Sequence, residues 1–254
     1  MPQEAGGHIV TSQIHIQGTA ADPALRAQCS LRDRGDELLA ELAAKAALAT
    51  DLQFPLGRRE ELRDRLIVFC ASPLVRHRLA IDQVLYSCAA GAADTRLLVR
   101  ALRVQHDLIA TRIAELERAD SSAEFAASAH ALVSMLEVCH QLEQEVLLPA
   151  LALLPGVDLP ALADDVDALL AGGVLNAPEV VDVREIPHGR RHPRIFGIYG
   201  RLAPGESFVL VNNHDPKPLR REFQATYPDQ FGWDYLEAGP DRWRVRIGRP
   251  PMKG

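Results

Sequence analysis

The sequence predicts an antiparallel four-helix bundle followed by a small two-layer domain with the element order βαβαββ. Apolar residues recur every three or four positions from about residue 23 to residue 153, which is typical of helices with one buried face. Short polar or proline-containing breaks divide this region, and helices joined by short loops pack antiparallel. After Asn176-Ala177-Pro178 short β-rich runs alternate with helical ones, which indicates a second, mixed α/β domain.

These patterns divide the chain into a helical bundle over residues 22–174, a linker over 175–179 and the βαβαββ domain over 180–250. Residues 1–21 partly alternate between apolar and polar side chains, so an edge strand and a disordered leader both fit them. No run approaches the roughly 18 apolar residues of a membrane span, and the N-terminus lacks a secretory pattern. The four cysteines form no Cys-x-x-Cys pair, as expected for reduced thiols. We therefore expect a cytoplasmic protein that does not enter a membrane.

The net charge of −6 is unevenly divided between the two regions. Residues 178–254 carry 13 Lys and Arg against 10 Asp and Glu, whereas the rest carries 15 against 24. So small a basic excess, without interleaved aromatic residues, argues against a nucleic-acid partner. A small ligand or a protein partner remains the expectation, and the sequence does not fix an oligomeric state.

Helix boundaries in the bundle follow from caps and breakers. Asp22-Pro23 supplies an N-cap and a proline at the first helical position of a helix that runs to about Asp51. Ser72-Pro73 should kink or restart the second helix, because proline cannot donate a helical hydrogen bond. The remaining expected breaks are Phe54-Pro55-Leu56-Gly57, Ala90-Gly91-Ala92 and Asp120-Ser121-Ser122, and a short fifth helix runs from near Pro160 to Gly172-Gly173.

In the second domain we expect strands over residues 180–184, 207–211, 231–236 and 243–247, and a helix over 192–202. Asp215-Pro216 predicts the start of a second helix, with Asp215 as its N-cap. Both helices should cover one face of the sheet.

Four metal-competent side chains lie on the apolar stripes of the bundle helices: His77, His106, Cys139 and Glu143. An unpaired buried polar group costs roughly 1–3 kcal/mol, so these side chains need a shared reason to be buried. Helical bundles build metal sites from inward side chains on facing helices. A metal site is therefore one reason to consider.

Three stretches, Val75–Tyr86, Val104–Ile109 and Cys139–Pro149, resemble the hemerythrin-like (His-His-Glu cation-binding) bundles. The resemblance implies that the second and fourth helices each present a His and a Glu four residues apart, that the first and third each add a His, and that the set holds two irons. It also implies a setting in iron, oxygen or nitric oxide handling.

This sequence keeps only part of that set. His77, His106 and Glu143 match, whereas Ile81 replaces a bridging Glu and Cys139 replaces a His. Gly35-Asp36 occupies the region of the first-helix His. Asp82 and His140 are adjacent to the lost positions, but one residue turns a helical side chain by about 100°.

Three interpretations stay open for the bundle. Isoleucine cannot bridge two irons, so a di-iron site is not expected. In the first interpretation His77 and His106 are core histidines hydrogen-bonded to Glu143, Asp36 or the backbone. In the second, His77, His106, Glu143 and Cys139 hold a single iron or zinc ion. Haem bound through His77 or His106 is the third.

The C-terminal region resembles a small domain of unknown function that is often fused to hemerythrin-like bundles. The likeness is carried by Asp182-Val183-Arg184, Arg191-His192-Pro193, residues 211–219 and Arg242-Trp243-Arg244-Val245. Its fold resembles that of the TusA/SirA-like sulfur carriers, which implies a reactive cysteine at the turn after the first strand. That turn reads Ile186-Pro187-His188-Gly189, without a cysteine, so we do not expect persulfide carriage.

Polar residues at expected strand ends and helix starts are candidates for a ligand site in this domain: Arg184, His192, His214 and Asp215. They would converge on one edge of the sheet and bind an anion or a metal. For the whole protein we expect a non-enzymatic binding or sensory protein of the hemerythrin-like class. The alternative is a metal-dependent oxidase, oxygenase or nitric-oxide-consuming enzyme with a remodelled site.

Overall fold

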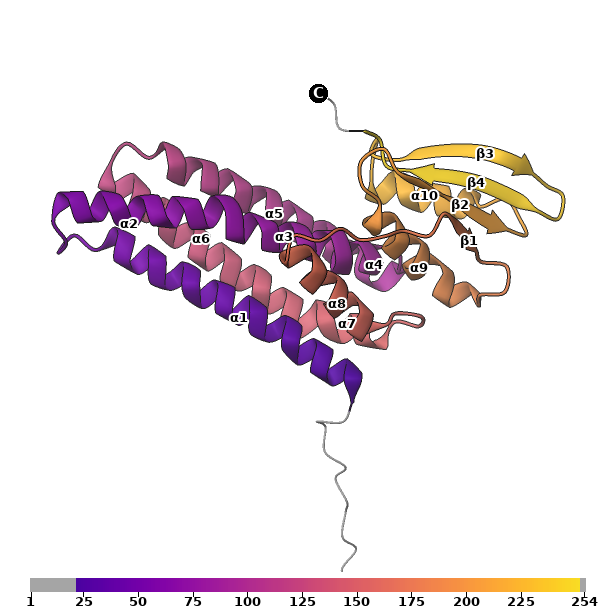
Figure 1. Ribbon diagram of the computed structural model, residues 1–254, viewed down its shortest axis with the longest axis horizontal. Helices are drawn as coiled ribbons and strands as arrows, with labels where there is room; N and C mark the ends of the chain where they lie inside the picture. The colour runs from indigo at the N-terminus through magenta and orange to yellow at the C-terminus, as the bar shows by residue number, and fades with distance from the viewer. Residues whose placement is uncertain (1–21, 252–254) are drawn as a thin grey trace, which may run out of the picture.

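The computed structural model describes residues 22–251 and contains a long helical bundle with an α/β domain at one end (Figure 1). The strand or leader expected within residues 1–21 lies outside the described residues. The order of elements confirms the fold prediction, a helical bundle followed by a βαβαββ domain.

The first half of the bundle consists of two antiparallel helical segments. Helix α1 (Pro23–Thr50) begins as expected, since the Asp22 carboxylate accepts the backbone N–H of Ala24 at 2.9 Å. The second segment contains α2 (Leu56–Phe69), α3 (Val75–Ile81) and α4 (Ser87–Ala90), joined by the π-helical turns η2 (Cys70–Leu74) and η3 (Asp82–Tyr86). Pro73 lies inside η2, so the wider turn carries the helical path past the proline without a new start.

The second half of the bundle returns along the first (Figure 1). It contains α5 (Ala93–Arg118), α6 (Ser122–Leu142), the π turn η4 (Glu143–Leu147), α7 (Leu148–Leu153) and the short α8 (Leu159–Leu170). A capping box starts α6, because Ser121 and Glu124 each accept the other's backbone N–H at 3.1 Å. The helices bury one apolar face each.

The C-terminal domain is a four-stranded mixed sheet with two helices on one face (Figure 1). Its elements are β1 (Val180–Asp182), α9 (His188–Arg201), β2 (Ser207–Asn212), α10 (Lys217–Thr226), β3 (Gly232–Ala238) and β4 (Trp243–Gly248). The strand order is β1-β2-β4-β3, in which β1 is parallel to β2 and the other neighbours are antiparallel.

Two details of this domain differ from the sequence prediction. Helix α9 begins four residues early, because the Arg191 guanidinium donates to the carbonyls of Ile186 (2.6 Å) and Arg184 (3.1 Å) and ties the first turn to the preceding loop. Asp215 is not the N-cap of α10. The cap is Pro216, and the Asp215 carboxylate instead accepts the Tyr235 hydroxyl at 2.9 Å.

The two domains are packed against one another. Helix α9 lies against α4, and a side chain at Gly200 would overlap the carbonyl of Gln83 in η3. The Tyr227 hydroxyl donates to the Ser87 hydroxyl at 3.0 Å, and Arg96 of α5 pairs with Glu222 of α10 at 3.0 Å. A single cluster of buried apolar residues extends through both domains.

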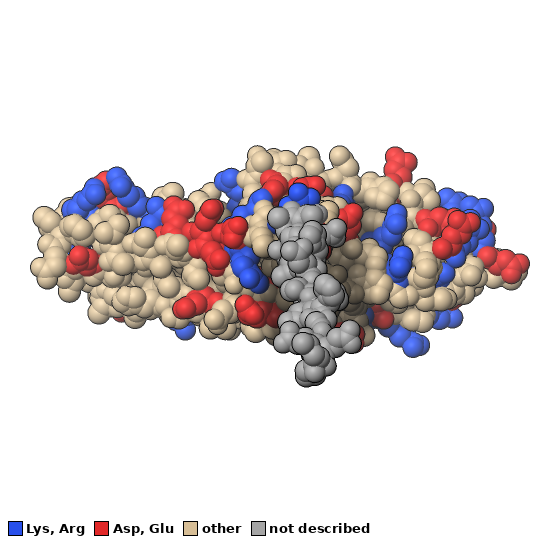
Figure 2. Space-filling model, turned by 90° about the horizontal axis from the view of Figure 1, so that it is seen from below, with Lys and Arg blue, Asp and Glu red and all other residues tan. Residues whose placement is uncertain are grey.

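The surface charge follows the division seen in the sequence. On the face in Figure 2, acidic side chains gather over the middle of the bundle, and basic ones are most concentrated over the C-terminal domain. None of the helices in residues 22–251 is long and apolar enough to cross a membrane.

Candidate metal site and the adjoining cleft

Three buried or half-buried side chains from neighbouring helices converge inside the bundle. His106 of α5, Cys139 of α6 and Glu143 at the start of η4 each offer one ligand atom, and these atoms lie within 4.8 Å of one another. Nitrogen, thiolate sulfur and carboxylate oxygen are all ligands that zinc and iron accept. The group could therefore hold a single metal ion.

Tyr86, the last residue of η3, holds this group together. Its hydroxyl donates to Oε1 of Glu143, lies 3.2 Å from Nε2 of His106 and lies 3.9 Å from Sγ of Cys139. Tyr86 and Glu143 thus stand at the end of one π turn and the start of another, and π turns are frequent at functional sites.

The protonation states of the three candidate ligands differ. Burial, followed by the charge of Arg78, lowers the pKa of His106 to about 4, so the imidazole is neutral near pH 7. Burial raises the pKa of Glu143, but His140 and the Tyr86 hydroxyl outweigh this effect and leave the pKa below its ordinary value. Burial and the charge of Glu143 raise the pKa of Cys139 to about 12, so the thiol keeps its proton until a cation displaces it.

A cavity of about 10 Å³ lies beside the group and is also lined by His77, Ile81 and His140. This volume accepts roughly one water-sized particle, which matches one ion and is far too small for a haem. Ile81 is 5% exposed and lines this cavity, and Glu143 is the sole carboxylate among the described lining residues. The residues present do not fit a dinuclear iron centre.

His77 lies at the cavity but is not part of the three-residue group. Burial lowers the pKa of His77, and within residues 22–251 its ring makes no hydrogen bond. His77 is therefore a neutral imidazole that lines the cavity outside the three-residue group.

From the sequence, His140 was expected to point away from the site, because it is one residue beyond Cys139 on the same helix. In the structure, Cys139 and His140 both line the cavity. Gly35 of α1 has no side chain, and a Cβ there would overlap the His140 imidazole. The ring fills this space, and its Nε2 lies 2.8 Å from Oδ1 of Asp36. A glycine next to an aspartate on the facing helix was the available signal for this arrangement.

The sequence analysis also did not select Tyr86 and Arg78 as site residues, since each appears as one more residue of a long helical stretch.

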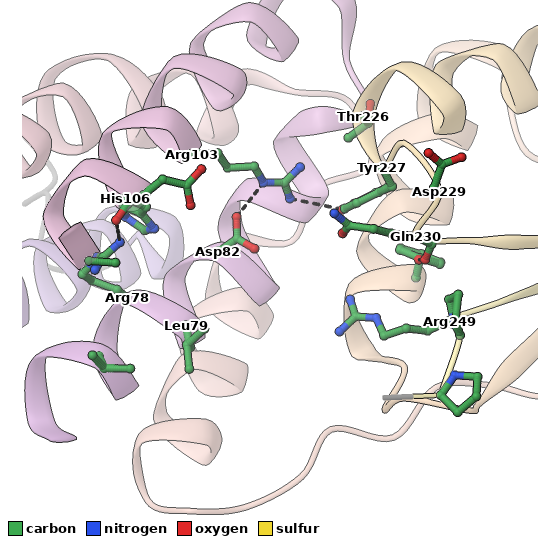
Figure 3. Close-up of a pocket in the computed structure, with 16 residues that line it drawn as sticks. Arg78, Leu79, Asp82, Arg103, His106, Thr226, Tyr227, Asp229, Gln230 and Arg249 are labelled. Carbon is green, nitrogen blue, oxygen red and sulfur yellow. Dashed lines mark hydrogen bonds and ion pairs between the residues drawn. The ribbon is translucent and has the colours of Figure 1, made fainter. Parts of the chain in front are cut away.

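A larger cleft of about 680 Å³ lies between the domains, next to the small cavity (Figure 3). Arg78 and His106 line both spaces, and the Arg78 guanidinium donates to the His106 carbonyl. Across the cleft, Tyr227 and Arg249 come from the C-terminal domain, and Arg103 reaches from α5 to Tyr227 at 3.3 Å. The candidate metal group is thus one side chain away from an interdomain space.

The four candidate residues of the C-terminal domain do not form one site. His192 and His214 line a small cavity of about 40 Å³, but His192 also pairs with Glu222 at 2.8 Å. Arg184 pairs with Asp182 at 2.7 Å on the surface, and Asp215 accepts the hydroxyl of Tyr235. Neither Arg184 nor Asp215 lines that cavity.

Comparison with known families identifies the C-terminal domain. The family model described as "Uncharacterized conserved protein (DUF2249)" matches residues 180–249, so this part of the chain is a DUF2249 domain. No curated protein and no solved structure matches the chain.

Proposed function

We propose that the bundle binds one metal ion, iron or zinc, through His106, Cys139 and Glu143, and that the protein is a non-enzymatic binding or sensory protein of the hemerythrin-like class. One observation carries this proposal: the three ligand atoms lie within 4.8 Å of one another beside an ion-sized cavity. The four-helix arrangement and the three matching stretches support the hemerythrin-like relationship. The βαβαββ order similarly supports a TusA/SirA-like fold for the DUF2249 domain.

The ligand set favours one metal ion. The neutral His106, the ionised Glu143 and a Cys139 thiolate carry two negative charges, which match one divalent cation. A second cation would need more anionic oxygens than this cavity offers. The fourth position would be taken by His77 or by a water.

The position of Tyr86 supports a sensory role. Tyr86 contacts all three candidate ligands and ends η3, the turn whose Gln83 packs against Gly200 of the DUF2249 domain. An ion at the site would displace the proton of Cys139 and draw Glu143 toward itself, which alters the hydrogen bond from Tyr86. Metal occupancy would thereby act on the turn that supports the interdomain contact, in keeping with a role in iron, oxygen or nitric oxide handling.

A second candidate is a metal-dependent oxidase, oxygenase or nitric-oxide-consuming enzyme. One observation favours it: His106 lines both the metal cavity and the interdomain cleft, which is large enough for a small-molecule substrate. Turnover of such a substrate by the metal-loaded protein, absent from the metal-free protein, would place this candidate ahead of the sensory one.

The proposal is tested by metal analysis and a visible absorption spectrum of the untagged protein, with His106→Ala as the variant. We expect one iron or zinc ion per chain in the wild type and a clearly lower metal content in His106→Ala. His130→Ala is the matched control, because His130 is exposed on α6. Equal metal content in wild type and His106→Ala would contradict the proposal.

A further inference from the structure

We propose that the interdomain cleft binds a small organic anion, in which a carboxylate or phosphate group is joined to an apolar body. The inference rests on the walls of the cleft and stands whether or not the bundle binds a metal. Its volume of about 680 Å³ falls within the range of roughly 300–1,000 Å³ found for small-molecule sites. Because both domains contribute walls, a ligand would contact the bundle and the DUF2249 domain together.

Arg249 is the first feature that points to an anion. Its side chain extends from the DUF2249 domain toward the bundle (Figure 3), and within residues 22–251 it forms no ion pair. Its backbone is fixed by two hydrogen bonds of 2.9 Å, one to Glu206 and one from Gly205. The guanidinium lies over the Tyr199 ring, 5.3 Å from its centroid, so this charge is held in place before any ligand arrives.

Two buried polar groups on the walls are the second feature. Arg78 and Thr226 are each 9% exposed, and Nε of Arg78 and Oγ1 of Thr226 are buried without a hydrogen-bond partner among the described residues. A buried group without a partner costs about 1–3 kcal/mol, and such groups require an explanation. Both groups are hydrogen-bond donors of residues that line the cleft, and a change of side-chain rotamer would present either one to the oxygens of a carboxylate or phosphate.

The acidic residues of the cleft do not cancel the positive charges of Arg78 and Arg249. Asp82 is already paired with Arg103 at 2.6 Å. Asp107 and Asp229 are exposed to solvent, whereas Arg78 is buried. The inner part of the cleft is therefore positive, and its acidic side chains are hydrated.

The remaining walls suit an apolar body. Leu79 is 63% exposed on α3 and lines this space, and further apolar or aromatic residues of the lining include Val75, Tyr199, Tyr227 and Pro250. An exposed leucine on the wall of a cleft is what a ligand with a ring or chain would cover.

The test uses three probes of similar shape on the full chain: benzoate, phenyl phosphate and the uncharged benzamide. Binding is followed by amide chemical shifts. We expect saturable binding of at least one of the two anions, with benzamide at least tenfold weaker. Arg249→Gln should weaken anion binding at least tenfold, and Arg249→Lys should weaken it less because the charge is kept. Arg246→Gln is the matched control, since Arg246 is an exposed arginine on β4, close in sequence to Arg249.

The comparison of the two anions also shows whether the site prefers a carboxylate or a phosphate group. Binding of benzoate alone assigns a carboxylate ligand, binding of phenyl phosphate alone assigns a phosphate ligand, and either result supports the proposal when it depends on Arg249. Equal binding of benzamide, no saturable binding of either anion, or anion binding that Arg249→Gln and Arg249→Lys leave unchanged would overturn it. Unchanged circular dichroism of the variants shows that a loss of binding is not a loss of folding.

Discussion

Gly35 and His140 form a complementary pair across the α1–α6 interface: the space left by the absent side chain of Gly35 is filled by the His140 imidazole. His140 is 8% exposed, and Nε2 of its ring lies 2.8 Å from the Asp36 carboxylate. The region of α1 where a hemerythrin-like bundle is expected to present a histidine thus receives one from α6 instead.

Gly35→Ala should destabilise the protein by about 1–3 kcal/mol, because the added methyl group forces the imidazole out of its position. This is a net loss, so the clash itself must cost more than the roughly 1 kcal/mol by which alanine is favoured over glycine in a helix. Urea unfolding measures the change. Gly57→Ala is the control, since nothing lies within 4 Å of a Cβ at that helical position, and it should be neutral or stabilising.

If the clash with His140 is the cause, Gly35→Ala should cost little in a His140→Ala background. A cost that is the same in both backgrounds would show that the two residues are not coupled.

Ile81→Ala should lower the free energy of unfolding by roughly 2–5 kcal/mol, the range for large-to-small substitutions in a core. The side chain is 5% exposed and lines the metal cavity. Leu79→Ala, on the same helix at a residue 63% exposed, should change stability by less than about 0.5 kcal/mol. A loss below about 1 kcal/mol for Ile81→Ala would contradict its assignment to the core.

More of the fold than of the candidate site could be predicted from the sequence. Helical periodicity and the Asp22 cap depend on neighbouring residues and were predicted correctly. Asp215 was a plausible cap, but a long-range bond from Tyr235 holds it instead. His140 was expected to turn away from the site, because a one-residue shift rotates a side chain by about 100°. Its long side chain reaches the cavity only because Gly35 lies opposite, a fact of tertiary packing that helical geometry alone does not contain.

Metal affinity should rise about tenfold per pH unit near neutral pH, because binding converts the Cys139 thiol into a thiolate. The pKa of Cys139 is about 12 and that of His106 about 4, so only the cysteine must lose a proton in this range. Raising the pH lowers the cost of that loss. Competition with a chelator at several pH values measures the slope, which should flatten in Cys139→Ser. An equally steep slope in Cys139→Ser would exclude the thiolate as a ligand.

Acid should weaken the contact between the domains through Glu222. Burial raises the pKa of Glu222, but His192 at 2.8 Å and Arg96 at 3.0 Å outweigh this effect and leave it lowered. Because the folded pKa is lowered, this stabilisation is present above the unfolded pKa and is lost as the pH falls through the folded value.

Glu222→Gln should therefore be less stable than wild type at neutral pH, and the difference should shrink in acid. Thermal unfolding at several pH values measures it. Glu60→Gln, at an exposed residue of α2, is the control. A difference that does not change with pH would show that the charge of Glu222 does not stabilise the interface.

The most direct test of the central claim is a cobalt(II) titration of the metal-free protein, followed by absorption spectroscopy. Cobalt replaces zinc or iron in such sites and reports its ligands. We predict saturation at one cobalt per chain, with a thiolate-to-cobalt charge-transfer band that is lost in Cys139→Ser, and weaker binding in His106→Ala and Glu143→Gln. Saturation at two ions, no binding, or a band that survives in Cys139→Ser would contradict a single metal ion held by His106, Cys139 and Glu143.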